Sequence, residues 1–122
     1  MYACMNLVWD DMCGNEVVDE IKSPDKKLKA VIFIRDCGAT TGYSTQLSIL
    51  GLEDRLDNET GNTFILSDKF GEGLSFDNGG AKVKALWTSE NSLTIYFDNK
   101  IEFTKQEEEI KDVRISYEQL VE

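Results

Sequence analysis

The chain has 122 residues, a formal net charge of −10 and no histidine. This length suits one domain with one core, and a composition of 41% hydrophobic and 30% charged residues is typical of a globular protein. The acidic balance disfavours binding to nucleic acid, and the lack of histidine removes the commonest general base and transition-metal ligand. We therefore expect a protein that is not an enzyme and holds no cofactor or metal.

The first 22 residues are expected to form an irregular N-terminal segment, packed on a domain that spans residues 23–122. Met1–Cys4 is too short for a signal peptide. An alanine directly before a cysteine is also what a bacterial lipoprotein leaves around its cleavage point, and an ordinary N-terminus is the alternative interpretation. The weak apolar run that ends at Ile21 shows no clear alternation.

Alternation of apolar and polar residues predicts short strands joined by turns. Residues 23–27 indicate a turn, and residues 28–35 are apolar on both faces, which indicates a central strand covered on both sides. Residues 43–50 alternate, which is typical of a half-buried strand. Further strands are expected at residues 62–67, 82–88, 92–97, 101–104 and 113–117, with a tight hairpin at 98–100. The pattern predicts an all-β fold, a single small antiparallel β-sandwich or meander of about six or seven strands.

The segment between the first two clear strands, residues 35–46, combines a cysteine, two glycines and several hydroxyl side chains. So many polar groups must be either exposed or fully hydrogen-bonded. We expect the ligand or partner surface to consist of Arg35, Asp36, Thr40, Thr41, Tyr43 and Gln46. Solvent-facing atoms of Arg35, Tyr43 and Gln46 should line a shallow depression. The alternative is a crosslinked corner in which the threonines bond buried backbone groups.

Other chemistry in the sequence has weaker support. Gly38 and Gly42 could cradle a phosphate, but no Gly-Lys-Ser/Thr follows and the next element is a strand. Cys37 lacks a histidine that would activate it as a nucleophile. Oxygen ligands suited to calcium occur in one glycine-rich loop, at Asp68, Glu72, Asp77 and Asn78. Their spacing is not that of an EF-hand, so we interpret them as solvated loop residues.

Several segments of the first half resemble a family of small bacterial proteins of unknown function. They are Cys13–Glu16, Ser23–Asp25, Lys29–Val31, Arg35–Gly42 and Ser44–Leu50. The resemblance covers roughly residues 13–50, and Arg-Asp-Cys-Gly-Ala-Thr-Thr-Gly is its most specific part. Many members look like envelope proteins with a signal or lipoprotein anchor. The resemblance thus implies a cell-envelope or secreted protein, with membrane attachment through an N-terminal anchor absent from this chain, and it implies no catalytic residues.

The three cysteines are Cys4, Cys13 and Cys37. Cys13 and Cys37 each precede a glycine and fall within the resembling segments, so we predict a disulfide bond between them. Closing a loop of about 25 residues is worth roughly 3 to 4 kcal/mol, and the bond implies an oxidising compartment. The competing arrangements are Cys4 with Cys13, Cys4 with Cys37, and three free thiols in the cytoplasm.

The expected function is that of a non-enzymatic bacterial envelope or secreted binding protein, whose partner is an unknown protein or small molecule. The alternative is an acidic intracellular inhibitor or immunity protein that blocks a basic partner, such as a nuclease or a nucleic-acid-binding protein. A third is a small hydrolase with paired carboxylates, although no spacing singles out a pair. If charge drives binding, affinity should fall steeply with added salt, since screening acts over about 10 Å near 0.1 M.

Overall fold

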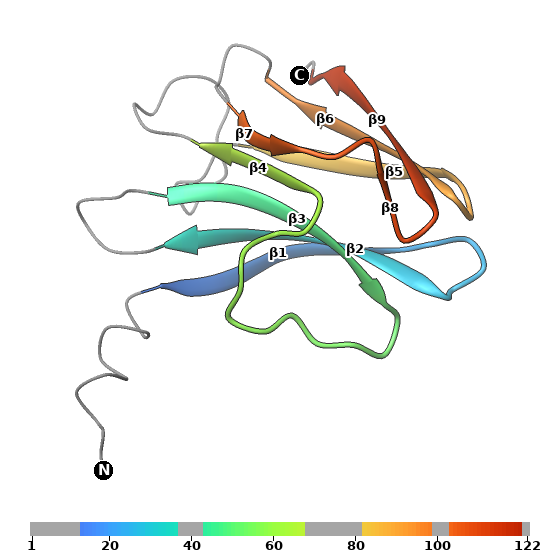
Figure 1. Ribbon diagram of the computed structural model, residues 1–122, viewed down its shortest axis with the longest axis horizontal. Coiled ribbons are helices and arrows are strands. Elements are labelled where there is room, and N and C mark those ends of the chain that lie inside the picture. Colours follow the sequence, from blue (N-terminus) through green and yellow to red (C-terminus); the bar gives the residue numbers. More distant parts are fainter. Residues whose placement is uncertain (1–12, 37–42, 68–81, 99–102, 121–122) are drawn as a thin grey trace.

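The computed structural model describes residues 13–36, 43–67, 82–98 and 103–120. These residues contain nine strands in two sheets, with no helix among them (Figure 1). The first sheet has the order β1-β2-β3-β4-β7, and the second has the order β5-β6-β9-β8. The all-β fold is therefore confirmed as a small sandwich, with more strands than the alternation alone indicated.

The first sheet is antiparallel throughout. Its strands are β1 (Gly14–Lys22), β2 (Leu28–Asp36), β3 (Tyr43–Gly51), β4 (Phe64–Ser67) and β7 (Phe103–Gln106). In the second sheet, β6 and β9 run parallel while the other pairs are antiparallel. Its strands are β5 (Val83–Ser89), β6 (Ser92–Phe97), β8 (Glu109–Ile110) and β9 (Val113–Gln119).

The segment expected to be irregular contains the edge strand β1. A bulge explains why its pattern was hidden: Val17 pairs with Phe33 and Asp19 pairs with Ile32, which leaves Val18 as an extra residue. A bulge shifts the side-chain alternation by one position. As a result, Val18 and Ile21 both pack against the main core, although their spacing does not follow a period of two.

A hydrogen-bonded turn joins β1 to β2, as the sequence predicted. The Lys26 amide donates to the Ser23 carbonyl at 2.9 Å, and Lys26 has a φ of 59°. The buried Ser23 hydroxyl donates to Asp25 Oδ1 at 2.7 Å and accepts from the Leu28 amide at 3.1 Å. The Ser23 hydroxyl, followed by the Lys27 amide, lowers the pKa of Asp25 from its ordinary value. These bonds set the register of the β1–β2 hairpin.

The main core lies between the two sheets. The first sheet contributes Ala30, Ile32, Leu47, Ile49, Phe64 and Leu66, and the second contributes Val83, Trp87, Leu93, Ile95, Phe97, Val113 and Ile115. The ring of Phe64 lies 5.1 Å from that of Phe97 and 5.5 Å from that of Tyr117, between centroids. Trp87 Nε1 donates to the Ile21 carbonyl at 2.8 Å. This bond links an edge strand of one sheet to an edge strand of the other.

Tyr117 joins β9 to the segment before β8 through its hydroxyl, which donates to the Glu107 carbonyl. Burial of the ring raises the pKa of Tyr117 above its ordinary value, and the negative charges of Glu107 and Glu108 raise it further. The hydroxyl therefore remains a neutral donor at physiological pH and is no candidate for acid–base chemistry there.

The outer face of the first sheet is covered by residues 52–63, the connection between β3 and β4, drawn in green in Figure 1. Leu56 packs against a second apolar cluster of Val31, Phe33 and Leu50. The expected central position of residues 28–35 is thus confirmed. The half-buried interpretation of residues 43–50 is wrong, because the connection buries the polar face of β3 as well as its apolar face.

Side-chain hydrogen bonds, rather than a backbone ladder, join the end of this connection to β3. Asn62 Oδ1 accepts from the Ile49 amide at 2.9 Å, and Asn62 Nδ2 donates to the Ile49 carbonyl at 2.9 Å. The Asn62 amide also donates to Ser48 Oγ at 3.0 Å. The polar alternation of β3 therefore marks contacts with the connection rather than with solvent.

Residues 99 and 100 of the hairpin expected at 98–100 lie outside the described residues, but the strand that follows, β7, does not return along β6. Strand β7 pairs with β4 in the first sheet, and β6 has β5 on one side and β9 on the other. A hairpin needs a free strand edge, and the C-terminal strand β9 occupies the edge that a returning strand would need. The chain therefore crosses from the second sheet to the first between β6 and β7.

Candidate binding site

Arg35, Asp36 and Tyr43, three of the residues expected to form a binding surface, lie at one end of the first sheet. Arg35 and Asp36 end β2, and Tyr43, which begins β3, lies opposite Asp36 in the register. Gln46 lies further along β3, opposite Phe33. Asp36 is exposed and Arg35 is half-buried. The two strands thus bring Arg35, Asp36 and the start of β3 together.

Several expected residues lie outside the described part of the chain. Thr40, Thr41 and the predicted disulfide partner Cys37 are among them, as are the loop residues considered for calcium, Asp68, Glu72, Asp77 and Asn78. For Tyr43 the backbone is described and the side chain is not. Within the described ranges, no group of three or more histidine, cysteine, aspartate or glutamate residues could hold a metal ion.

Arg35 forms the centre of a polar cluster on the outer face of the first sheet, the face that residues 52–63 cover. Its Nη1 donates to Asn15 Oδ1 at 2.8 Å, to Asn58 Oδ1 at 2.9 Å and to the Glu59 carbonyl at 3.2 Å. These acceptors come from β1 and from the connection that covers the sheet. We call Arg35, Asn15, Asn58 and Glu59 the Arg35 cluster. Hydrogen bonds from a charged donor are stronger than neutral ones, so the guanidinium joins three chain segments at one point.

The two asparagines extend the Arg35 cluster with their amide groups. Asn15 Nδ2 donates to the carbonyls of Asp57 and Glu59 at 3.0 and 2.8 Å, and Asn58 Nδ2 donates to the Cys13 carbonyl at 2.8 Å. Neither asparagine was expected from the sequence to be part of the site. Asn15 lies in the resembling segment Cys13–Glu16, which is a signal that could have found it; Asn58 lies in a polar connection with no distinguishing pattern.

Gln46 has a different role from the one expected. Its side chain is 4% exposed. Gln46 Oε1 accepts from the Gly61 amide at 2.6 Å, and Gln46 Nε2 donates to Ser44 Oγ at 2.8 Å. The expectation of a solvent-facing Gln46 is therefore wrong, because residues 52–63 cover this part of β3. Gln46 holds the connection in place beneath the Arg35 cluster.

Carboxylates flank the Arg35 cluster along the chain. Asp36 follows Arg35, Glu16 follows Asn15, and Asp57 precedes Asn58; all three acidic side chains are exposed, as is that of Glu59. Because side chains alternate along a strand, Glu16 and Asp36 lie on the other face of the sheet from Asn15 and Arg35, so these two carboxylates do not surround the Arg35 cluster.

No protein family, no curated protein sequence and no solved structure matches this chain. No helix among the described residues is long and apolar enough to cross a membrane.

Proposed function

We propose that this chain is a non-enzymatic binding protein of the bacterial envelope or of the secreted fraction. Its binding surface is the β2–β3 end of the first sheet: Arg35, Asp36, Thr40, Thr41 and Tyr43, with Gln46 as a buried support. The observation that carries the proposal is the Arg35 cluster, which bonds the end of β2 to β1 and to the connection of residues 52–63.

The proposal rests on rigidity at the point where the segment leaves the sheet. Binding residues are commonly presented on loops that a rigid scaffold positions, and ordering side chains on binding costs roughly 0.5 to 1.5 kcal/mol each. The end of β2 is already held by the hydrogen bonds of Arg35. Binding therefore need not order this part of the sheet, which lowers the entropic cost.

The register of β1 and β2 supports a Cys13–Cys37 disulfide bond at the same end. Gly14 pairs with Asp36 and Asn15 pairs with Arg35; continuing this register by one residue would set Cys13 opposite Cys37. Opposed residues in antiparallel strands have Cα atoms about 4.5 to 5.5 Å apart, within the range of about 4.4 to 6.8 Å that disulfides span. Such a bond would suit an oxidising compartment.

Peptide mapping under non-reducing conditions tests this bond. We expect protein prepared without reductant to yield one crosslinked peptide that contains Cys13 and Cys37, and a Cys4→Ser variant to yield the same peptide. Recovery of Cys13 and Cys37 as free thiols, or crosslinked to Cys4, contradicts the proposal. Free thiols at both positions would favour the acidic intracellular inhibitor instead, whereas a bond to Cys4 would still require an oxidising compartment.

Site-specific photo-crosslinking in the native host tests the binding surface. A photoreactive amino acid at Asp36, which is exposed at the proposed surface, should yield a discrete adduct. The same amino acid at Lys84, which is exposed on β5 of the other sheet, should not. Arg35→Met should reduce the adduct, because it removes the donor that holds the cluster together. Arg55 is an exposed arginine in the connection of residues 52–63. Arg55→Met is therefore the control and should leave the amount of adduct unchanged.

The outcomes of this experiment separate the two functions. Equal adducts at Asp36 and Lys84, or none at either position, contradict the proposed surface. If exposed charges contribute to binding, the Asp36 adduct should weaken as salt rises above about 0.1 M, where charges are screened beyond about 10 Å. A partner confined to the cytoplasm, together with reduced cysteines, would support the inhibitor function.

A further inference from the structure

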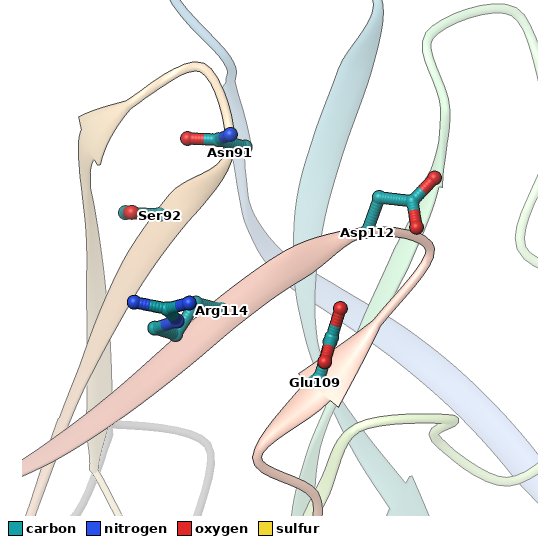
Figure 2. A pocket seen from close by; sticks show the side chains of 5 residues that line it. All are labelled: Asn91, Ser92, Glu109, Asp112 and Arg114. Atoms are coloured by element: carbon teal, nitrogen blue, oxygen red, sulfur yellow. The ribbon is translucent and has the colours of Figure 1, made fainter.

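A small polar pocket lies at the opposite end of the sandwich from the Arg35 cluster, on the second sheet. It is lined by Asn91, Ser92, Glu109, Asp112 and Arg114 and has a volume of about 160 Å³ (Figure 2). Because a site for one water needs roughly 10 to 15 Å³ of such space, there is room for several non-hydrogen atoms. The pocket therefore suits the head group of a small ligand.

Strand pairing fixes the positions of the lining residues. Arg114 on β9 is paired with Ser92 on β6 and with Glu109 on β8, so the three residues form one row across the sheet. The Arg114 amide donates to the Asn91 carbonyl at 2.9 Å. Lys111 and Asp112 form the two-residue turn before β9, and both have positive φ, 51° and 65°, as in a type I′ hairpin. The backbone beneath the pocket is thus held by three strands.

The charged side chains of this pocket lie on neighbouring strands and the turn that joins them but form no ion pair with each other. Although Glu109 lies directly opposite Arg114 in the register, no ion pair or hydrogen bond joins the side chains of Arg114, Glu109 and Asp112 within the described part of the chain. Figure 2 shows Glu109 and Asp112 on the β8 side of the pocket and Asn91 and Ser92 on the β5–β6 side. One guanidinium and two carboxylates therefore remain available to a ligand.

We propose that this pocket binds the zwitterionic head group of a free α-amino acid. Arg114 would bind the carboxylate through its two parallel donors, and Glu109 and Asp112 would accept from the ammonium group. Two carboxylates disfavour a simple anion, and the guanidinium disfavours a metal cation. Because the lining residues carry one positive and two negative charges, a basic amino acid such as lysine complements them better than an acidic one.

The proposal is independent of the Arg35 cluster and is tested by NMR titration of the whole chain, labelled with ¹⁵N, against L-lysine. We expect saturable shifts of the Ser92 and Arg114 amides, with a Kd on the order of 1 mM, because exposed charge pairs contribute little each. Nα-acetyl-lysine and lysine amide, which each lack one head-group charge, should bind roughly two- to fivefold more weakly. L-Glutamate should bind more weakly than L-lysine.

Arg114→Met and Glu109→Gln should each weaken L-lysine binding by a similar roughly two- to fivefold factor, while Arg55→Met should not change it. All three side chains are exposed, and the dispersion of the amide spectrum reports whether each variant is folded. Absence of saturable shifts at Ser92 and Arg114 would overturn the proposal. Equal affinity for L-lysine and for its two blocked analogues would also overturn it, since the head-group charges would then have no role.

Discussion

Phe64→Ala is expected to lower the free energy of unfolding by about 3 to 5 kcal/mol, the range for removing a buried aromatic side chain. Phe64 is fully buried, and its ring contacts Phe97 and Tyr117 of the other sheet. Truncation would leave a cavity between two sheets whose backbones are held by hydrogen bonds and cannot close around it. A loss of this size is a large part of the roughly 5 to 15 kcal/mol that stabilises a typical domain.

Chemical denaturation, followed by tryptophan fluorescence, measures this loss. Phe64→Leu retains part of the buried volume and should cost less than Phe64→Ala. Val17→Ala is the control for an apolar side chain that is 46% exposed, and we expect its effect to stay within about 0.5 to 1 kcal/mol. If Phe64→Ala cost no more than Val17→Ala, the packing of the two sheets through Phe64 would be disproved.

Gly61→Ala is expected to lower the free energy of unfolding by about 1 to 3 kcal/mol, because it overpacks a closed site. A Cβ atom on Gly61 would lie 2.8 Å from the Leu47 carbonyl oxygen and 3.1 Å from Gln46 Cβ. The first of these contacts is with backbone, so either β3 or the connection must move. The variant should therefore lift residues 52–63 from the sheet and disturb the Arg35 cluster that they help to form.

Gly14→Ala is the matched control for this substitution. No atom lies within 4 Å of a Cβ atom placed on Gly14, so we expect a change near zero, or a gain of up to about 1 kcal/mol from the stiffer unfolded chain. Amide hydrogen exchange should show faster exchange at Gly61 and Asn62 in Gly61→Ala and unchanged exchange in Gly14→Ala. Equal stability of the two variants would contradict the close contact between the connection and β3.

Local signals in the sequence were sufficient for part of this fold. Residues 28–35 are apolar at every position of their central part, which only a strand covered on both faces accommodates. The Ser23–Lys27 turn has proline and aspartate where turn geometry needs them. For the candidate site, proximity in the chain was enough to bring Arg35, Asp36 and Tyr43 together, because they flank one short connection between paired strands.

Contacts between residues far apart in the chain decided the burial of Gln46, the place of Asn58 in the cluster and the pairing of β7. The alternation in β3 is the same whether its polar face meets water or a covering segment, so Gln46 could not be assigned to the interior from sequence. Arg35 meets Asn58 across 23 residues of chain. Strand β7 pairs with β4 because β9, formed later in the chain, occupies the free edge of β6.

The sequence by itself determined that this protein is all-β, where most strands lie, and that the β2–β3 end concentrates polar groups, since these properties follow from alternation and turn chemistry over a few residues. Only the tertiary structure decided which strands share a sheet, that Gln46 is buried against the connection, and that Arg114 lies between Ser92 and Glu109. Those arrangements depend on which strand edges and faces remain uncovered once the rest of the chain has packed. Such information is spread over the whole chain and has no local pattern.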